Sequence, residues 1–314
     1  MTNSSKQTRL VYLYAMHYRL LGSSGIKISE IGFGCMSMSS NSDIENTNLI
    51  HHAVSLGINY FDTADLYDKG MNETVVGTAV KKIRNKIVLA TKVGNQWRHD
   101  GSGWDWNPGK AYILHAVEDS LRRLQTEYID LYQLHGGTIN DPIDETIEAF
   151  EQLKQGGKIR HYGISSIRPN VINEYIKRSS AVSVMMQYSL ADRRPEENIF
   201  DLLQEKNISV LARGAIAQGL LVNKPAKEYL NYSKEEISII NEAIKTLPGN
   251  RTPAQTAIQY VLHHPAVASA IIGIRNREQL EEAVAVVPAL SNEEFRRLQK
   301  VVRPNIYEQH RIDN

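Results

Sequence analysis

Short apolar runs alternate with longer amphipathic segments along almost the whole chain. The runs are rich in β-branched and aromatic residues, which favour buried strands, whereas the longer segments repeat apolar residues with helical spacing. Predicted strands cover residues 31–35, 58–61, 87–92, 129–134, 159–164, 182–187, 208–213 and 268–272. Predicted helices cover residues 46–56, 73–84, 110–124, 142–156, 170–178, 197–205 and 276–286. The chain therefore repeats a strand–helix unit.

Eight such strands, at about 30 residues per unit, predict an α/β fold with a closed (β/α)8 TIM barrel rather than a doubly wound sheet with a second domain. A hairpin is predicted before the first strand, where residues 18–21 and 26–28 flank Gly-Ser-Ser-Gly, and would close the bottom of the barrel. Extra C-terminal helices are expected in residues 233–264, broken near Pro248-Gly249, and in residues 292–301, capped by Ser291. We expect residues 16–314 to form one barrel domain and residues 1–15, which lack an export-signal pattern, to be an N-terminal extension outside the fold.

Composition limits the classes of function. Lys plus Arg number 36 and Asp plus Glu 35, a net charge of +1, so no positive excess recruits nucleic acid. The single cysteine cannot form an internal disulfide or a cysteine-rich zinc site, which favours a reducing compartment. No apolar run approaches the ~20 residues of a membrane span. We therefore expect a cytoplasmic protein without nucleic-acid or membrane partners; its oligomeric state is not predictable from these patterns.

Ionisable residues stand at the carboxyl ends of three neighbouring predicted strands. Asp62 ends the second strand, Lys92 the third and His135 the fourth, and Tyr67 follows Asp62 by five residues. The carboxyl ends of the strands face the active-site mouth of a (β/α)8 barrel, so these side chains are expected to meet there. Adjacent histidines, as in residues 51–52 and 263–264, project about 100° apart on a helix, so no metal site is expected.

This cluster suits general acid catalysis. A tyrosine titrates near pH 10, so it is a poor acid–base group at neutral pH unless a nearby cation favours its phenolate. Lys92 would supply that charge, Asp62 would hold the ammonium, and His135 would orient a carbonyl substrate or donate to its oxygen. Each residue alone also has a structural interpretation, as an ion pair or a hydrogen-bonded core histidine. Their joint occurrence at consecutive strand ends favours catalysis.

At these positions the sequence resembles the aldo-keto reductase superfamily, whose pattern has a strand-end Asp, a Tyr five residues later, a strand-end Lys and a strand-end His. The resemblance spans about residues 18–302 and includes Gly32-Phe33-Gly34, Asp62-Thr63-Ala64-Asp65-Leu66-Tyr67, Asp130-Leu131-Tyr132-Gln133-Leu134-His135, Gly163-Ile164-Ser165-Ser166 and Ile271-Ile272-Gly273. It implies a (β/α)8 barrel and reversible reduction of carbonyl compounds with NADPH/NADP. Tyr67 would be the proton donor, supported by Asp62, Lys92 and His135.

The resemblance also implies how the cofactor is bound. The implied residues are Ser165, Ser166 and Gln187 at the nicotinamide carboxamide; Gly34, Cys35 and Met36 at its ribose; Gln218 and Gly219 at the pyrophosphate; Arg275 at the 2′-phosphate, in the adenosine-phosphate segment that begins at Gly273; and Gln279 and Glu282 facing the adenine. Asp62, Gly214, Ala215 and Ile216 are further residues expected to bind the cofactor. Arg213 replaces the aromatic residue that the family usually places against the nicotinamide, and its planar guanidinium can stack on a ring. Alternatively, Cys35 is a small buried filler, and Arg275 and Arg277 are solvated residues at a helix start.

All three tryptophans lie in the glycine-rich segment 94–108 after the third strand. Trp97, five residues after Lys92, is the candidate for a substrate-binding wall. Trp104 and Trp106 would either join it or pin the loop to the barrel. We expect an NADPH-dependent enzyme that reduces small-molecule aldehydes or ketones. Two alternatives remain: a cofactor-sensing regulatory subunit with little turnover, and a barrel isomerase of phosphorylated substrates.

Overall fold

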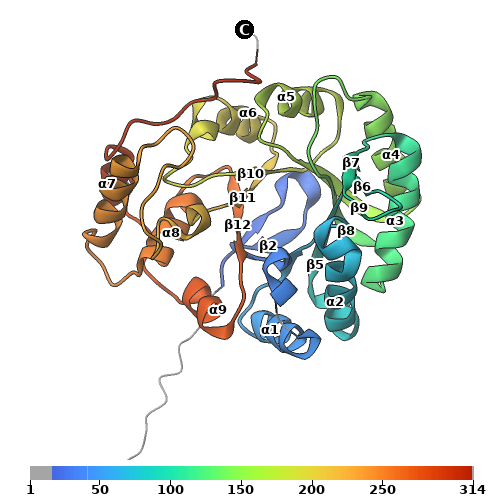
Figure 1. Ribbon diagram of the computed structural model, residues 1–314, viewed down its shortest axis with the longest axis horizontal. Helices are drawn as coiled ribbons and strands as arrows, with labels where there is room; N and C mark the ends of the chain where they lie inside the picture. Colours follow the sequence, from blue (N-terminus) through green and yellow to red (C-terminus); the bar gives the residue numbers. More distant parts are fainter. Residues whose placement is uncertain (1–15, 41, 313–314) are drawn as a thin grey trace, which may run out of the picture.

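The chain folds into a closed barrel of eight parallel strands surrounded by helices (Figure 1). The computed structural model describes residues 16–40 and 42–312, so the extension expected over residues 1–15 lies outside the described residues. Around the barrel the strands are β3 (Ile31–Gly34), β4 (Tyr60–Asp62), β5 (Val88–Val93), β8 (Ile129–Leu134), β9 (Ile159–Ser165), β10 (Ser183–Gln187), β11 (Ser209–Arg213) and β12 (Val267–Gly273). Pairing of β12 with β3 closes the ring. The (β/α)8 barrel prediction is confirmed.

Helices follow the strands and form the outer layer (Figure 1). They are α1 (Asp43–Ser55), α2 (Met71–Val80), α3 (Lys110–Leu124), α4 (Ile143–Gln155), α5 (Pro169–Arg178), α6 (Ile199–Glu205), α7 (Lys234–Lys245), α8 (Pro253–His263), α9 (Arg277–Val284) and α10 (Asn292–Gln299). The predicted break in residues 233–264 separates α7 from α8. Within residues 16–40 and 42–312, no helix combines the length and the apolar sequence needed to cross a membrane.

Several element boundaries differ from prediction by up to four residues, and two of these differences have local reasons. Helix α1 begins three residues early because Ser42 and Glu45 form a capping box, in which each side chain accepts a hydrogen bond from the other's backbone N–H. Strand β4 loses its first two predicted residues. There the Asn59 side chain accepts from Ser29 N at 2.7 Å and donates to Lys27 O at 2.9 Å, tying this part of the chain to the N-terminal hairpin.

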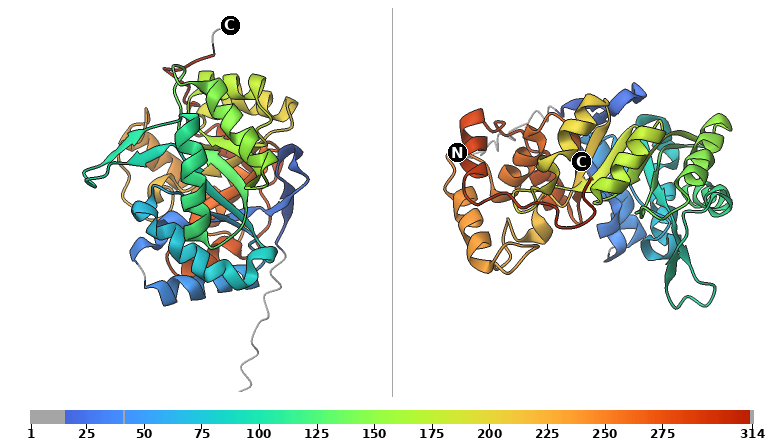
Figure 2. Two further views of the ribbon diagram at one scale, coloured as in Figure 1. Left: turned by 90° about the vertical axis from the view of Figure 1, so that its right-hand side faces the viewer. Right: turned by 90° about the horizontal axis from the view of Figure 1, so that it is seen from above.

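The N-terminal hairpin closes one end of the barrel, as predicted. Strands β1 (Tyr18–Leu20) and β2 (Lys27–Ser29) pair antiparallel, and Figure 2 shows them beyond one end of the barrel. Leu21 and Ile28 are fully buried in a cluster with apolar residues from the barrel interior, among them Tyr60 and Leu131. Gly22 N also donates to Ser209 Oγ at 2.6 Å. The hairpin therefore plugs the end opposite the carboxyl ends of the strands.

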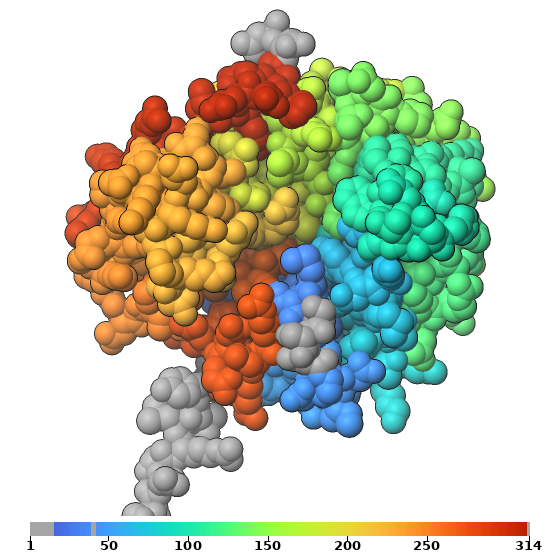
Figure 3. Space-filling view, viewed as in Figure 1, coloured from blue at the N-terminus to red at the C-terminus, as the bar shows by residue number. Residues whose placement is uncertain are grey.

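A second hairpin, which the sequence did not predict, stands at the other end (Figure 2). Strands β6 (Asn95–Trp97) and β7 (Trp104–Trp106) pair Trp97 with Trp104 inside the segment expected to be a loop. Trp106 pins the hairpin: its Nε1 donates to Asp141 Oδ2 at 3.0 Å, and its ring covers Gly94 so closely that a Cβ there would lie 2.7 Å away. The hairpin shows on the face of the molecule in Figure 3.

The C-terminal segment, residues 300–312, crosses the end of the barrel that also carries the β6–β7 hairpin. Asn170 N donates to His310 O at 2.9 Å, and Arg193 N donates to Asn305 Oδ1 at 2.7 Å. Beneath this segment lies a cavity of about 400 Å³, lined in part by Ile167, Leu230 and Ile306. The chain after α10 is therefore part of the wall of this face.

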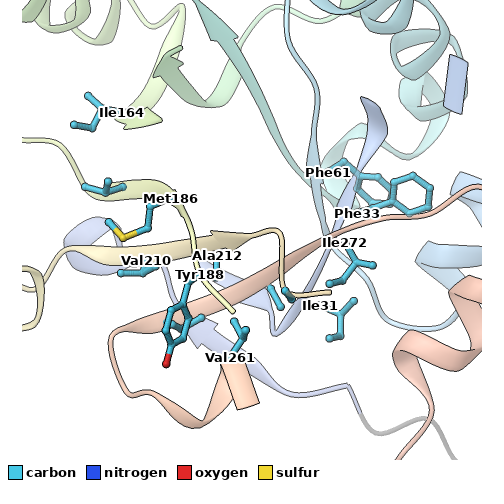
Figure 4. Packing of buried hydrophobic residues seen from close by; sticks show 14 of the residues in the cluster. Ile31, Phe33, Phe61, Ile164, Met186, Tyr188, Val210, Ala212, Val261 and Ile272 are labelled. Carbon is cyan, nitrogen blue, oxygen red and sulfur yellow. The ribbon is translucent and has the colours of Figure 1, made fainter. Parts of the chain in front are cut away.

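Strand residues alternate between two apolar layers. Between strands and helices, Phe33 and Phe61 stack with ring centroids 5.6 Å apart (Figure 4). The barrel interior holds Tyr60, Ala90 and Leu131 among others. Because side chains alternate with a period of two, the next inward positions towards the carboxyl ends belong to polar or small residues: Gly34, Asp62, Lys92, Gln133, Ser165, Gln187, Arg213 and Gly273. This uppermost layer of the interior forms the floor of the candidate site.

Candidate active site

The structure brings the four predicted catalytic residues together at one point. Asp62 ends β4, Lys92 lies in β5, His135 follows β8 directly, and Tyr67 lies in the loop after β4. Lys92 Nζ donates to the Asp62 carboxylate, to Thr63 O at 2.8 Å and to the Tyr67 hydroxyl at 3.3 Å. The Tyr67 and His135 rings meet edge to face with centroids 5.8 Å apart. The arrangement joins a phenol, an ammonium and an imidazole at the mouth.

The ammonium of Lys92 is held by buried acceptors. Lys92 is 1% exposed and Asp62 4%. Burial opposes the charged form of the lysine, but Asp62 and Tyr67 outweigh it and raise the pKa of Lys92. Gln133 Nε2 donates to the second oxygen of Asp62 at 3.0 Å. Sequence reasoning missed Gln133, although its place two residues after the inward-facing Leu131 was a usable signal.

His135 stays uncharged over the neutral range. Burial, with the charges of Lys92 and Arg213, lowers the pKa of His135 to about 3. Among the described residues, no hydrogen-bond partner reaches its buried Nδ1. A neutral imidazole carries one N–H donor and one acceptor nitrogen. His135 can therefore donate to an oxygen near Tyr67 without adding a positive charge.

Predicted carboxamide-binding residues also gather across neighbouring strands. Gln187 at the end of β10 accepts from Arg213 Nη1 at 3.2 Å and donates to the Tyr229 hydroxyl at 2.8 Å. Ser165 ends β9 next to β10, and Ser166 follows it. Tyr229, from the long segment between β11 and α7, was missed because no local pattern marked it. The Gln187 amide thus links the guanidinium of Arg213 with the Tyr229 hydroxyl.

The loop after β11 carries five further predicted residues. Gly214 has φ +77°, and a Cβ there would lie 3.2 Å from Gln187 Cγ, so only glycine fits without strain. Ala215 is buried and Ile216 is half-buried. Gln218 and Gly219 are left-handed, with φ of +59° and +91°. The loop therefore folds tightly against the carboxamide-side residues.

At the end of β3, three predicted residues face different surroundings. Gly34 lies between Asp62 on β4 and Gly273 on β12 in the strand pairing. Cys35 is fully buried in the apolar layer, and burial raises the pKa of its thiol. Met36 is 60% exposed. The Cys35 side chain fills the core, so a ligand at this point would meet its backbone.

The residues predicted to bind the 2′-phosphate and the adenine lie around the start of α9 and along it. The side chain of Asn276 caps this helix by accepting from Gln279 N at 2.9 Å, and Gln279 Oε1 accepts from Arg275 N at 3.0 Å. Arg277 is paired with Glu281 at 2.7 Å. Glu282 lies one turn after Glu278, and its carbonyl accepts from Gln255 Nε2 at 3.1 Å. A helix N-terminus flanked by two arginines suits an anion.

Trp97 is tied to the loop that carries Tyr67. Its Nε1 donates to Leu66 O at 3.3 Å, and the Lys69 ammonium lies 5.3 Å from its ring centroid. Lys69 also donates to Gly101 O at 3.4 Å. Trp97 therefore links the β6–β7 hairpin to the residues on either side of Tyr67.

The adjacent histidines bind separate partners. His51 contacts Ala79 O at 2.8 Å, His52 contacts Glu281 at 3.0 Å, and His263 stacks on Phe295 with centroids 4.1 Å apart. Within the described part of the chain, no group of three or more His, Cys, Asp or Glu residues could hold a metal ion.

Comparison with known proteins places this geometry in a family. A family model described as the aldo/keto reductase family matches residues 30–303. Uncharacterized oxidoreductase YqkF from Bacillus subtilis (strain 168) is 52% identical over 307 residues, which cover 94% of this chain and 100% of that relative.

Solved structures show the same similarity. The holo form of aldo-keto reductase AKR11C1 from Bacillus halodurans has a TM-score of 0.90 at 52% identity, over 95% of this chain and 100% of that one. An aldo/keto reductase from Klebsiella pneumoniae in complex with NADP and acetate has a TM-score of 0.75 at 28% identity, over 93% and 98% of the two chains.

Proposed function

Because this chain belongs to the aldo/keto reductase family, whose members use NADP(H), we propose that it reduces aldehydes and ketones to alcohols with NADPH and that Tyr67 delivers the proton. The observation that carries this proposal is the 3.3 Å contact between Lys92 Nζ and the Tyr67 hydroxyl. Asp62, itself held by Gln133, fixes the ammonium in a buried site, so the charge of Lys92 acts on the phenol with little screening.

The residues at the mouth fit NADPH. Gln187 offers an amide on the carboxamide side, and Arg213 next to it offers a planar guanidinium that can stack on a ring. Arg275 and the N-terminus of α9 offer positive charge and N–H donors for a 2′-phosphate. When bound, the reduced nicotinamide supplies the hydride for the carbonyl carbon.

Tyr67 and His135 then act on the carbonyl oxygen, and Lys92 supports Tyr67. Tyr67 donates its proton to this oxygen as negative charge develops there, and Lys92 stabilises the phenolate that remains. His135, uncharged above about pH 3, donates an N–H to the same oxygen and orients the substrate. The products are an alcohol and NADP, and the phenolate regains its proton from solvent. The substrate therefore needs only a carbonyl group that reaches Tyr67 and His135.

The test is a panel of aldehydes and ketones assayed by NADPH oxidation, with wild type and Tyr67→Phe. Tyr67→Phe should lower the rate of the chemical step by ~10²–10⁴ because it removes the general acid. Its affinity for NADPH, measured by cofactor fluorescence, should change by no more than a few-fold. Tyr18→Phe is the matched control, because Tyr18 lies at the plugged end of the barrel, where its hydroxyl donates to Gly57 O at 2.7 Å.

Two results would contradict the proposal. Tyr67→Phe retaining more than half of the wild-type rate, where chemistry limits turnover, would exclude Tyr67 as the proton donor. Binding of NADPH without turnover of any carbonyl compound in the panel would favour a cofactor-sensing subunit instead.

A further inference from the structure

The backbone directly after Tyr67 is left-handed at three consecutive residues. Asp68 has φ +48°, Lys69 +55° and Gly70 +86°. Residues with a Cβ rarely adopt this conformation, and two in succession persist only where surrounding contacts hold them. The contacts that hold this turn therefore influence where the Tyr67 hydroxyl lies.

One of these contacts comes from Arg123 on α3. A Cβ on Gly70 would lie 2.8 Å from Arg123 Nε, so the guanidinium packs directly on the turn. Arg123 Nε and Nη2 both bind Glu73 Oε2, at 2.7 and 2.6 Å. Glu73 lies in the first turn of α2 and its side chain is fully buried. A buried carboxylate with a fixed guanidinium thus braces the residues that follow Tyr67.

The second oxygen of the same carboxylate reaches the strand of Lys92. Glu73 Oε1 accepts from Thr91 Oγ1 at 2.6 Å, and Thr91 directly precedes Lys92 in β5. One buried side chain therefore connects the turn after Tyr67 with the strand that carries its ammonium partner. We call Glu73 and Arg123 the Glu73–Arg123 pair.

A second carboxyl group lies beside this pair. Asp65, two residues before Tyr67, is buried, and burial together with the charge of Glu73 raises its pKa well above the ordinary range, against the effect of Arg123. Its Oδ2 accepts from the Tyr112 hydroxyl at 3.4 Å. Tyr112, like Arg123, belongs to α3. The loop is anchored to α3 on both sides of the catalytic position.

We propose that the Glu73–Arg123 pair is a positioning device for proton transfer, which sets the distance between the Tyr67 hydroxyl and Lys92 Nζ. The proposal rests on the proposed function of Tyr67 as proton donor. Replacing a buried ion pair with apolar residues is often neutral for stability, so a pair kept in this place is not explained by stability alone. The contacts of the pair instead fix the positions of its neighbours: Arg123 binds one oxygen of Glu73 with two N–H groups, and the Thr91 hydroxyl binds the other oxygen.

The neighbouring arginine provides a matched control. Arg122 lies on the same helix, but its side chain is 73% exposed and its ion pair is with Asp119. We compare Arg123→Met with Arg122→Met, using an aldehyde that the wild type reduces. The measurements are the single-turnover rate of hydride transfer, the dissociation constant of NADPH and the pH dependence of the rate.

Arg123→Met should slow hydride transfer roughly 10- to 100-fold, as expected for a misplaced reacting group. The alkaline limb of its pH–rate profile should move to higher pH, because a phenolate farther from the Lys92 ammonium is less stabilised. His135, whose ring meets Tyr67, and Asp62, which binds Lys92, are not substituted in any of these variants. NADPH affinity should stay within about two-fold, and Arg122→Met should match the wild type in all three measurements.

Two further variants test the Glu73–Arg123 pair: one keeps the charge of Arg123, and the other disturbs the contact of Arg123 with the turn. Arg123→Lys keeps the charge but loses the planar fork, so its rate should lie between those of wild type and Arg123→Met. Gly70→Ala, with φ +86° and a Cβ pushed against Arg123, should give the same lowered rate and shifted limb. Should Arg123→Met fail to fold, which its thermal unfolding and circular dichroism would show, Gly70→Ala and Arg123→Lys decide the question.

The proposal is overturned if Arg123→Met or Gly70→Ala loses thermal stability but keeps the wild-type hydride-transfer rate and pH profile, since the pair is then only structural. Tyr67→Phe in the same series separates this failure from that of the proposed function. If Tyr67→Phe is inactive and Arg123→Met is fully active, the positioning role is rejected and the proton-donor role of Tyr67 stands. An active Tyr67→Phe rejects the proton donor itself.

Discussion

At the scale of single residues, charges are placed by burial and by their nearest partners. Lys92 keeps its ammonium in a dry site because Asp62 and the backbone oxygen of Thr63 accept from it, whereas His135 loses its proton in the same surroundings. Beside Tyr67, Lys92 therefore provides a positive charge, whereas His135 provides an uncharged hydrogen-bond donor. The pH dependence of stability should reveal this difference.

We expect His135 to make the protein less stable in acid. Its pKa is about 3 in the folded chain against an ordinary value of 6.5, so between these values the unfolded state binds a proton that the folded state does not. Stability therefore falls as the pH is lowered from about 6.5 to 3, with a slope that corresponds to the uptake of at most one proton on unfolding for this residue. His135→Asn should flatten the dependence by that amount in urea unfolding curves measured across this range.

The matched control for this prediction is His115→Asn, because the His115 side chain is 77% exposed and meets water in both states. An equal slope for wild type and His135→Asn would show that His135 takes up its proton in the folded protein.

Arg275 should determine the preference for NADPH over NADH. A charge-assisted hydrogen bond to the 2′-phosphate contributes roughly 1.5–3 kcal/mol, so Arg275→Ala should weaken NADPH binding by about one to two orders of magnitude. NADH, which lacks that phosphate, should bind almost unchanged. The measurement is the ratio of the two dissociation constants at one fixed salt concentration.

Arg277 is the comparison residue, since it is already paired with Glu281 and its side chain is 67% exposed. Arg277→Ala should change the ratio less than Arg275→Ala, and the double variant should show the full loss. If the double variant keeps the wild-type ratio of the NADPH and NADH dissociation constants, neither arginine binds the 2′-phosphate.

At the scale of elements, the β6–β7 hairpin and the loop after β4 form one unit above the barrel. Trp97 and Lys69 connect them through the Leu66 and Gly101 carbonyl groups, and Trp106 fastens the hairpin to the barrel. A substitution in the hairpin can therefore act through lost contact with substrate or through movement of the Tyr67 loop.

Trp97→Ala should raise KM for bulky aromatic aldehydes more than for small aliphatic ones, because only large substrates would reach the indole. Trp97→Phe loses the bond to Leu66 O but keeps an aromatic surface, so it should preserve KM for the bulky substrates. Trp104→Ala, on the opposite strand and 47% exposed, serves as the control within the hairpin. Equal effects of Trp97→Ala on both substrate classes would indicate loop support rather than a substrate wall.

At the scale of the whole molecule, the two ends of the barrel have separate tasks. One end is plugged by the β1–β2 hairpin and packed with apolar side chains, and the other ends in the polar layer that contains Asp62 and Lys92. Stability and chemistry should therefore respond independently to substitutions at the two ends.

Leu21→Ala should cost about 2–5 kcal/mol of unfolding free energy, because Leu21 is fully buried in the plug. The hydride-transfer rate of the folded fraction should stay unchanged. Leu20→Ala is the matched control: Leu20 is 54% exposed, so its loss should change stability by no more than about 0.5 kcal/mol. Chemical unfolding together with single-turnover rates would check both, and a slowed chemical step in Leu21→Ala would show that the ends are coupled.

The repeat of strands and helices could be predicted because it depends on local side-chain patterns. The barrel strands are buried on both faces, so short continuous apolar runs mark where each strand lies. The two-residue alternation of side-chain direction then places Asp62, Lys92 and Gln187 on the inward face near the carboxyl ends of their strands. Positions along a strand are local information, so the floor of the site is encoded in short stretches of sequence.

Contacts between distant residues were settled only by the tertiary structure. Gln133 and Asp62 are 71 residues apart, Arg123 and Glu73 are 50 apart, and Gln187 and Tyr229 are 42 apart. Nothing in the sequence near any of these residues specifies its partner, because the partners meet only once the barrel has closed. The sequence alone determined the barrel and the chemical groups at its mouth; tertiary packing decided which of them touch, and with it the 3.3 Å between Tyr67 and Lys92.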